Sequence, residues 1–347
     1  MSSERPKAQS PKPKAQSSRL QAHDSKLFRP AASWERLRLR AGLLRRLREF
    51  FDHRGFLEVE TPVLSAETVV DRHLDPFSLL TADGGGRPPR TLWLQTSPEL
   101  AMKRLLAAGG EAIYQVSRVF RQGEQGPLHN PEFTLVEWYR SGDGLDEAMQ
   151  CTSDLCVELL GVGPAERLSY HSAFLRHVGL DPHTASTAAL AAAGDGCDLP
   201  PPESLSPEDR DGWLDWLLAE RVQPRLGLGR PVLLYDYPAS QAALAQVRPG
   251  NPPVAERFEL YVEGIELANG YHELLDPGEL QSRTVAANAR RVADGKQPLP
   301  EPGRLLAAMQ SGLPAAAGVA LGFDRLVMLA ARAKTIAEVL AFPINRA

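Results

Sequence analysis

Residues 119–139 read VFRQGEQGPLHNPEFTLVEWY and decide the fold. The pattern predicts a β-hairpin. Arg121 ends one strand, a polar loop with two glycines follows, and a second strand carries Glu137 and Tyr139. The tip of such a hairpin can close over a ligand, and an ordinary hairpin with an arginine on its surface is the alternative.

Apolar alternation predicts the strands around this hairpin, at 112–119, 132–139, 232–237, 258–267 and 318–321. Several are joined by turns too short for helical crossovers, which favours antiparallel pairing. Ser33 is an N-cap type of residue and precedes a helical repeat that runs to Phe51. The Ala- and Leu-rich stretch of about 143–230 is expected to be a helical insertion, so the fold class is α+β.

Composition is that of a globular protein, with 43% hydrophobic and 24% charged residues among 347 and a formal net charge of −4. No run reaches the ~18 apolar residues of a membrane helix, so we expect a cytoplasmic protein that has no membrane partner. Residues 1–32 are basic, repeat the sequence PKAQS and are expected to be disordered. The three cysteines lack metal-ligand spacing and are expected to be neutral thiols rather than zinc ligands.

Glycine-rich phosphate loops are missing from the sequence, both G-x-x-x-x-G-K-[ST] and G-x-G-x-x-G after a strand. A bound nucleotide would therefore be held by side chains. Arginine is the natural candidate, because its planar guanidinium binds a phosphate through two charge-assisted hydrogen bonds.

Residues 264–273 read GIELANGYHE and contain two acids seven residues apart, Glu266 and Glu273. Near a polyphosphate, such a pair suggests Mg²⁺, which prefers oxygen ligands. The acids could instead bind a substrate ammonium group, or the stretch could be a solvated edge strand. If Gly270 introduces a bulge, Glu266, Asn269 and Tyr271 need not share one strand face.

Residues 318–329 read GVALGFDRLVML, a strand punctuated by glycine that leads into an apolar helix. Arg325 falls in the first turn of this helix, where the helix dipole disfavours a cation. Its position therefore requires a reason. Either an anionic ligand or an ion pair with Asp324 would supply one.

Together the three segments resemble motifs 2 and 3 and the intervening acidic strand of the class II aminoacyl-tRNA synthetases. RGFLEVETP at 54–62 looks like their motif 1, and HNPEFT at 129–134 is similar to the lysyl branch. Within that branch the chain looks most like the family of elongation factor P lysine ligases. The segments that carry this likeness are WYR at 138–140, PASQAALAQ at 238–246, ELANGYHEL at 266–274, GVALG at 318–322 and TIAEVLAFPINRA at 335–347.

This resemblance covers residues 33–347 and implies the class II synthetase catalytic fold, with a six-stranded antiparallel sheet flanked by helices. It also implies a homodimer formed through motif 1. The implied reaction uses ATP and Mg²⁺ to convert (R)-β-lysine to an adenylate, and passes the β-lysyl group to a lysine of elongation factor P. No tRNA is expected, since an anticodon-reading OB-fold needs on the order of 100 residues and 33 precede the first predicted helix.

Roles carry over from the resemblance residue by residue. Arg121 would contact the α-phosphate and Arg325 the γ-phosphate, while Glu266 and Glu273 would hold Mg²⁺. The nucleotide is assigned to Arg121, Gln122, Gly123, Glu124, Asn130, Phe133, Glu266, Leu267, Gly322 and Arg325. The amino-acid substrate is assigned to Ser97, Pro98, Glu99, Glu137, Tyr139, Asn269, Tyr271, Glu273 and Ala320.

Two positions are diagnostic. Gly123 stands where motif 2 usually has glutamate, so Glu124 or a backbone carbonyl would have to bind the adenine amino group. Ala320 stands where lysyl synthetases generally have glycine, and its methyl group favours a β-amino acid.

A ligase with another acceptor would keep the same adenylation residues. A non-catalytic paralogue would be expected to lose one of the two arginines or two acids assigned to the triphosphate and Mg²⁺. All four are present: Arg121, Arg325, Glu266 and Glu273.

Overall fold

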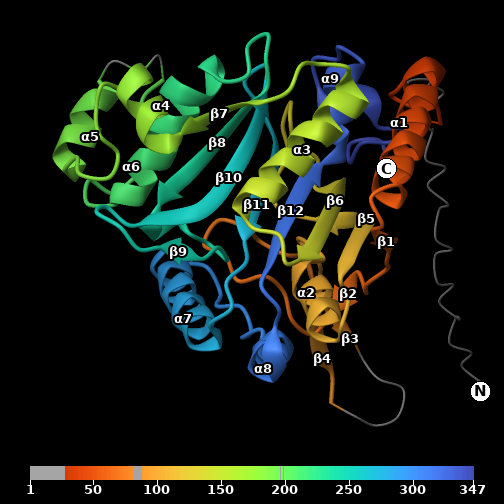
Figure 1. Cartoon of the computed structure of the whole chain (residues 1–347), viewed down its shortest axis with the longest axis horizontal. Coiled ribbons are helices and arrows are strands. Elements are labelled where there is room, and N and C mark those ends of the chain that lie inside the picture. Colours follow the sequence, from red (N-terminus) through yellow and green to blue (C-terminus); the bar gives the residue numbers. More distant parts are fainter. Residues whose placement is uncertain (1–27, 82–87, 196, 198) are drawn as a thin grey trace, which may run out of the picture.

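The predicted hairpin consists of β5 (Ala112–Phe120) and β6 (Glu132–Ser141), which pair in antiparallel register with Gln115 opposite Glu137. It lies inside the larger sheet that Figure 1 shows. The structure, a computed structural model, describes residues 28–81, 88–195, 197 and 199–347.

The main sheet has the strand order β1-β5-β6-β12-β11-β10-β8-β7, with β9 paired to β10 (Figure 1). From β5 to β8 all neighbours are antiparallel, which confirms the predicted arrangement of six strands. The end strands β1 and β7 pair in parallel instead, after long crossovers of the kind that parallel pairs require. The bounds are β1 (Leu57–Glu58), β7 (Glu166–Ser169), β8 (Val232–Pro238), β9 (Val247–Arg248), β10 (Val254–Val262), β11 (Ile265–His272) and β12 (Ala316–Gly322).

One predicted strand differs from the structure, and the motif 1 stretch, residues 54–62, forms a strand only over the two residues of β1. Residues 258–267 are not one strand, because they contain the turn of the hairpin β10–β11. Glu263 and Gly264 make that turn with φ of 50° and 74°, a conformation that favours glycine. A separate small sheet has the order β2-β4-β3, with β2 (Leu64–Ser65), β3 (Ser78–Thr81) and β4 (Arg90–Leu94).

The bulge in β11 lies at Leu267 and not at Gly270. Leu260 pairs with Ala268 and the next residue, Tyr261, pairs with Glu266, so Leu267 is the extra residue. Gly270 stays in register, and a Cβ there would lie 2.4 Å from the Phe258 ring. Because side chains alternate along a strand, the extra residue turns Glu266 to the face of Asn269.

Helices cover the apolar face of the sheet, and Figure 1 shows α3 crossing in front of β11 and β12. Ser33 caps the first of them as predicted, since its side chain accepts the N–H of Arg36. The ring of Phe51 stacks on Tyr114 with centroids 4.6 Å apart, and both are buried in the same apolar cluster as Phe258. These helices are α1 (Trp34–Asp52), α3 (Leu145–Leu160) and α9 (Phe323–Ala330).

A second apolar cluster packs beyond β7 and β8, around Tyr170, Phe174 and Leu217. Most of it comes from the stretch predicted as helical, 143–230, which also contributes β7 to the main sheet, and the rest comes mainly from β8 and β10. Burial raises the pKa of Cys151 to about 11 and that of Cys156 to about 12, so both thiols are neutral. The helices are α4 (Tyr170–His177), α5 (Thr187–Gly194), α6 (Arg210–Leu217), the π-helix η2 (Leu218–Val222) and the 3₁₀ turn η3 (Gln223–Arg225).

The polar face of the sheet is bordered by a third group of helices, which pack on one another through Met102, Leu106, Leu280 and Leu305. They leave the middle of that face uncovered, and the candidate site lies there. The helices are α2 (Glu99–Ala107), α7 (Pro277–Ala293) and α8 (Gly303–Gly312). The remaining short turns are η4 (Ala239–Gln241) and η5 (Ile336–Val339), of which η5 packs in the first apolar cluster.

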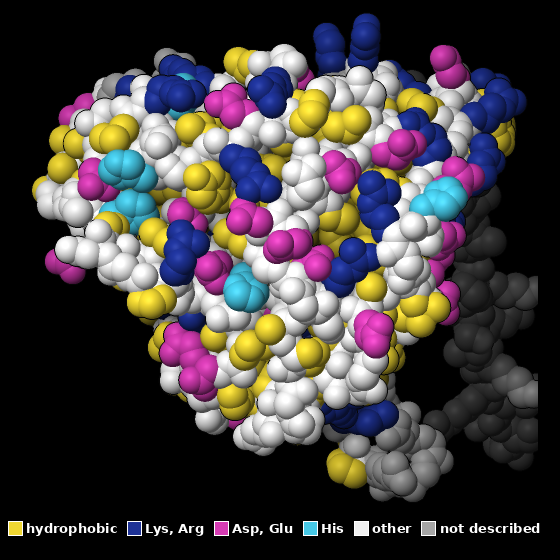
Figure 2. Space-filling view, viewed as in Figure 1, with side chains coloured by type: hydrophobic (Ala, Val, Ile, Leu, Met, Phe, Trp, Pro, Cys, Tyr) yellow, Lys and Arg dark blue, Asp and Glu magenta, His cyan; other side chains and the backbone are white. Residues whose placement is uncertain are grey.

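Residues 1–27 of the predicted tail lie outside the described residues. Within 28–32, the N–H groups of Ala31 and Ala32 donate to the carbonyls of Ala341 and Leu340, so this segment pairs with the end of the chain. Figure 2 shows Lys and Arg side chains gathered over α1, where Arg38 and others are exposed. Among the described residues, no helix combines the length and apolar character needed to cross a bilayer.

Candidate active site

Two rows of side chains lie side by side across four strands on the polar face. Register places Glu137, Ala320, Asn269 and Glu259 opposite one another on β6, β12, β11 and β10. Two residues along, Tyr139, Gly318, Tyr271 and Arg257 form the next row. Because alternate residues share a face, both rows point away from the apolar core. The small residues of β12 therefore form the floor of a furrow with polar walls.

A cavity of about 1220 Å³ opens over this furrow. Sites for single small molecules usually measure about 300–1,000 Å³, so a nucleotide and a second substrate fit together. Most of the predicted site residues line this cavity: Ser97, Glu99, Arg121, Glu124, Asn130, Phe133, Glu137, Tyr139, Glu266, Leu267, Asn269, Tyr271, Glu273, Ala320, Gly322 and Arg325.

Pro98, Gln122 and Gly123 are not part of the cavity wall in the described part of the chain. Pro98 is the N-cap of α2, and the Gln122 N–H donates to the carbonyl of Asp75 at 2.7 Å. Gly123 has a φ of 83°, which disfavours a larger residue and gives a local reason for the missing glutamate. Its neighbour Glu124 lines the cavity instead.

Arg121 is held at the end of β5 by contacts on two sides. Its guanidinium carbon lies 5.0 Å from the centroid of the Phe133 ring, a cation–π distance. Nε donates to the Thr96 carbonyl at 3.4 Å, and Nη1 lies 3.8 Å from Glu124 Oε1. A guanidinium has five N–H donors, so these contacts orient the group and leave donors for an anion.

Arg325 enters the cavity from the first turn of α9. Its Nη1 donates to the Glu266 carbonyl at 2.8 Å and lies 3.4 Å from Glu266 Oε2. Its Nη2 lies 2.7 Å from His129 Nε2. Burial and the Arg325 charge lower the pKa of His129, so its neutral imidazole accepts this hydrogen bond.

The expected alternative, an ion pair between Asp324 and Arg325, is not formed. Asp324 instead lies 2.5 Å from Arg40 Nη1 and accepts the backbone N–H of Thr134 at 2.9 Å. The charge of Arg325 is therefore not neutralised by its chain neighbour. Together with Arg121 it makes this end of the cavity suited to a polyphosphate.

Glu266 and Glu273 lie too far apart to share one Mg²⁺. They are separated by seven residues of extended chain with one bulge, roughly 20 Å. Two glutamate side chains and two Mg–O bonds of about 2.1 Å cannot span that distance. Within the described residues, no cluster of three or more His, Cys, Asp or Glu side chains suits a metal ion.

Glu266 has a nearer acidic neighbour in Glu259 of β10. Glu266 is opposite Tyr261, two residues from Glu259, and such diagonal neighbours lie about 7–8 Å apart at Cα. Burial and the Glu259 charge raise the pKa of Glu266. Glu259 itself does not line the cavity, because it is already bound to Arg257 Nη2 at 2.5 Å and accepts the Tyr261 hydroxyl. Mg²⁺ is usually held by one or two carboxylates together with substrate phosphates. The residues present therefore fit Mg²⁺ at Glu266.

Three acids gather at the other end of the furrow. Glu137 is 1% exposed, and its two oxygens accept hydrogen bonds from Ser97 Oγ at 2.6 Å and the Tyr139 hydroxyl at 2.8 Å. Burial and the Glu99 charge raise its pKa to about 7. Glu273 is equally buried and lies 2.5 Å from Lys103 Nζ. Acids confined in this way are suited to ammonium groups taken out of water.

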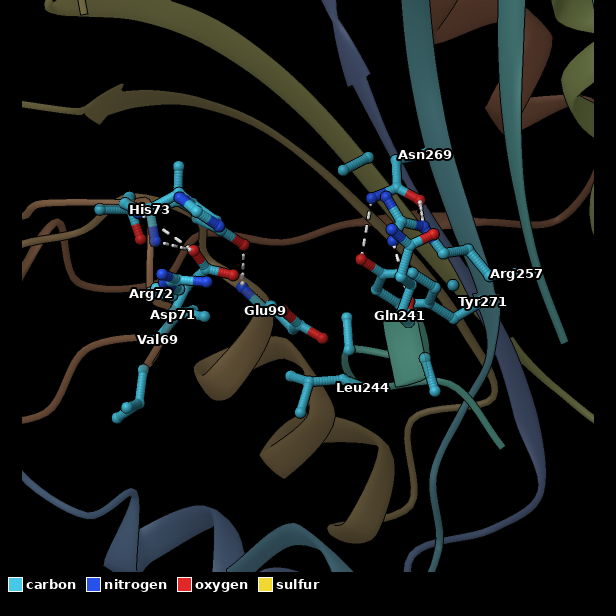
Figure 3. A pocket seen from close by; sticks show the side chains of 18 of the residues that line it. Val69, Asp71, Arg72, His73, Glu99, Gln241, Leu244, Arg257, Asn269 and Tyr271 are labelled. Carbon is cyan, nitrogen blue, oxygen red and sulfur yellow. Dashed lines mark hydrogen bonds between the residues drawn. The ribbon is translucent and has the colours of Figure 1, made fainter. Parts of the chain in front are cut away.

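The loop of residues 69–74 forms the wall opposite the furrow, as Figure 3 shows: Val69, Asp71, Arg72 and His73 lie across from Arg257, Asn269 and Tyr271, with Glu99 between. Arg72 fastens this loop to two helices. It binds Asp294 after α7 at 2.7 Å and the α6 cap Asp209 at 2.6 Å. The wall is therefore tied to α6 and α7, so its position depends on both helices.

Four residues near the site were missed from the sequence: Lys103, His129, Glu259 and Arg257. Lys103 is four residues after Glu99 on one helix, a spacing that signals an ion pair. His129 stands inside the quoted hairpin loop. Arg257 and Glu259 alternate on β10, and would have been found if the turn at Glu263 and Gly264 had been recognised.

Comparison with known proteins agrees with this geometry. Residues 16–346 match the family model described as tRNA synthetases class II (D, K and N). The elongation factor P--(R)-beta-lysine ligase of Vibrio vulnificus (strain YJ016) is 48% identical over 319 residues, 91% of this chain and 98% of the relative. The proteins of that name from Salmonella typhi and Edwardsiella ictaluri (strain 93-146) are 46% identical over 320 and 322 residues, each 92% of this chain and 98% of the relative. The three relatives named here are elongation factor P--(R)-beta-lysine ligases, and the chain belongs to the class II tRNA synthetase family (D, K and N).

Proposed function

We propose that the protein activates (R)-β-lysine with ATP and transfers the β-lysyl group to a lysine side chain of elongation factor P. One observation carries the proposal. Arg121, Arg325 and Glu266 line the same cavity as the buried acids Glu137 and Glu273. A phosphate-binding end thus faces an ammonium-binding end across a single furrow.

At the phosphate end, the two guanidinium groups bind the triphosphate and stabilise charge that develops on it. Arg121 serves the α-phosphate and the attacking carboxylate, and Arg325 serves the γ-phosphate. Phe133 and Asn130 bind the adenine base. Glu124 binds the adenine amino group in place of the usual motif 2 glutamate, whose position Gly123 occupies. Preorganised donors of this kind supply most of the acceleration, since no covalent enzyme intermediate is needed.

Glu266 would hold Mg²⁺ at the phosphate end of the cavity. When bound, Mg²⁺ neutralises phosphate charge and withdraws electrons from the reacting phosphorus. The Arg325 hydrogen bond to the Glu266 carbonyl fixes the backbone at this point. Glu266 and Arg325 therefore act together beside the triphosphate.

At the ammonium end, Glu99, Glu137 and Glu273 bind the two amino groups of the substrate. Its carboxylate then lies toward Arg121, where it attacks the α-phosphorus and pyrophosphate leaves. In the second step the acceptor amine attacks the carbonyl carbon of the adenylate. A C–N bond forms, the bond to the AMP oxygen breaks, and the amine loses a proton.

Homodimer formation is supported by exposed apolar side chains near the motif 1 stretch. Leu57 is 66% exposed, and Val63, Leu64 and Leu105 are exposed as well. A partner that covered these residues would bury apolar surface at about 25 cal/mol per Å². We further propose that the protein works in the cytoplasm without tRNA, because its acceptor is a protein side chain.

Two assays test the proposal in sequence. Pyrophosphate exchange with (R)-β-lysine, α-lysine and a broad amino-acid panel tests activation, and we expect the fastest exchange with (R)-β-lysine. Mass spectrometry of purified elongation factor P after incubation tests transfer, and we expect one added β-lysyl group. Exchange without modification would favour a ligase with another acceptor. The absence of exchange with every amino acid would leave the non-catalytic paralogue.

A further inference from the structure

The ammonium-binding end contains a buried lysine that the roles above leave unassigned. Lys103 on α2 is 2% exposed. Its Nζ donates to Glu99 Oε1 at 2.6 Å and lies 2.5 Å from Glu273 Oε2. Both acids line the cavity, whereas Lys103 does not, so the lysine lies behind the two carboxylates that a substrate would meet.

The groups that face this lysine come from three elements. Glu99 lies on α2 with Lys103, Glu137 and Tyr139 lie on β6, and Glu273 directly follows β11. Glu137 is hydrogen-bonded by the hydroxyls of Ser97 and Tyr139, which are neutral donors. In the described part of the chain, this cluster therefore holds three carboxylates and one ammonium group.

The carboxylates are also held in fixed positions. A Cβ at position 318 would lie 2.2 Å from both Glu273 Oε1 and the Tyr139 ring, so Gly318 leaves the space that these side chains occupy. Ser97 Oγ accepts the backbone N–H of Glu99 at 3.0 Å and donates to Glu137 at 2.6 Å, so the hydroxyl that binds Glu137 is itself held at the start of α2. Lys103 completes the arrangement from behind by joining Glu99 to Glu273.

We propose that Lys103 is a positioning residue that fixes the substrate charge accepted at this end of the cavity. Its ammonium group orients Glu99 and Glu273 and neutralises one of the three acids. Two negative charges remain, and they match the two ammonium groups of a diamino acid. An amino acid with one ammonium group leaves a buried carboxylate without a partner, which is costly. This inference rests on the proposed function and deepens its substrate class.

Binding should then be coupled to a proton. Burial raises the pKa of Glu137 to about 7 and also raises that of Glu273, so the empty site holds a proton near neutral pH. A diammonium substrate replaces that proton. The Lys103 charge opposes the rise in pKa at both Glu137 and Glu273, so its removal moves their titration to higher pH.

The test is pyrophosphate exchange with (R)-β-lysine from pH 6 to 9.5, measured for the wild type, Lys103→Met and Lys103→Arg. For Lys103→Met we expect the amino-acid KM to rise roughly 10- to 100-fold at pH 7, the equivalent of one to two pKa units. The pH midpoint of 1/KM should move up by at least one unit, while the KM for ATP changes less than 2-fold. Lys103→Arg retains the charge and should keep the wild-type midpoint.

Lys296→Met is the matched control. It removes a partly exposed ion pair that does not line the cavity, in which Lys296 Nζ lies 2.9 Å from Asp75. We expect it to leave the pH midpoint unchanged. A Lys103→Met midpoint equal to that of the wild type, or a loss confined to kcat, would overturn the inference.

If Lys103→Met does not fold, the wild type still provides a test. Calorimetry of (R)-β-lysine binding at pH 7, in buffers of different ionisation enthalpy, should show release of a measurable fraction of a proton, up to about one, per substrate. Binding without proton release would overturn the inference. Failure of the proposed function is distinguishable, because the wild type itself would then show no exchange with any diamino acid.

Discussion

Asp324 is paired with Arg40, a residue 284 positions away in the chain, and not with its neighbour Arg325. The Arg40 side chain is 14% exposed and that of Asp324 is 1% exposed. Arg40 also donates to the Thr134 hydroxyl at 2.7 Å, so α1, β6 and α9 meet at one buried polar contact. This contact leaves Arg325 available to the cavity and fixes the first turn of α9.

Arg40→Leu should therefore destabilise the protein strongly. Removal of one partner leaves the buried Asp324 carboxylate without its cation, which typically costs about 3–5 kcal/mol. Urea denaturation followed by circular dichroism measures the free energy of unfolding. Arg36→Ala is the control, because the Arg36–Glu338 pair is 29% and 37% exposed and solvent screens such a pair. Equal losses in both variants would contradict the expectation.

Arg325→Ala should lower the rate of activation about 10²- to 10³-fold, the usual effect of removing one preorganised donor to transition-state charge. The fold should survive, because Asp324 keeps its own partner. Single-turnover adenylate formation measures the effect, with thermal unfolding as the check on folding. Arg325→Lys should recover part of the rate, since it restores the charge without the planar fork. An unchanged rate in Arg325→Ala would remove this residue from the mechanism.

Glu266→Gln and Glu273→Gln should differ in their effects. Glu266 lies beside Arg325 and Glu259, so its replacement should raise the Mg²⁺ concentration needed for half-maximal exchange, by about 10-fold or more. Glu273 is paired with Lys103 at the other end of the furrow, so its replacement should raise the KM for the amino acid instead. Titrations of Mg²⁺ and of (R)-β-lysine separate the two effects. A shift in Mg²⁺ dependence in Glu273→Gln alone would restore it as the metal ligand.

Gly318→Ala should weaken amino-acid binding, because the new Cβ would lie 2.2 Å from Glu273 Oε1 and from the Tyr139 ring. Both side chains would have to move, and we expect at least a 10-fold rise in the KM for (R)-β-lysine. Gly42→Ala is the matched control. A Cβ at position 42 has nothing within 4 Å, and alanine favours a helix by up to about 1 kcal/mol. An unchanged KM in Gly318→Ala would show that Glu273 and Tyr139 can move aside without loss of amino-acid binding, which would contradict this prediction.

The sequence predicted the central fold because its signals are local. Ser33 caps a helix within its own first turn, and the hairpin around Arg121 is contained in one short segment. The parallel end strands β1 and β7 are joined to the sheet through long crossovers, which alternation within a segment does not reveal. The bulge lies at Leu267 and not at Gly270, because its position depends on how β10 and β11 pair. The sequence of a single strand does not contain that information.

The candidate site was predicted residue by residue, but its internal pairings were not. Arg40 and Asp324 are far apart in the chain, and no local pattern connects them. The Lys103–Glu99 ion pair could have been predicted, since the two residues are four apart on one helix. The contact of Lys103 with Glu273 could not, because it depends on the arrangement of α2 against β11. Glu259 is hidden in the sequence because apolar alternation alone does not separate the turn at Gly264 from the interior of a strand.

The stability of the ligand-free protein should depend on pH through Glu137. Burial raises the pKa of Glu137 to about 7, from about 4.5 in an unfolded chain. Between these values the folded state holds a proton that the unfolded state has lost, so this group's contribution to stability falls as pH rises through that window. The difference amounts to roughly 3 kcal/mol. Urea denaturation of the ligand-free protein at pH 5 and pH 8 should therefore show a smaller loss for Glu137→Gln than for the wild type. Glu132→Gln, whose side chain is 49% exposed on the same strand, should behave as the wild type, and equal losses in all three would place the titration elsewhere.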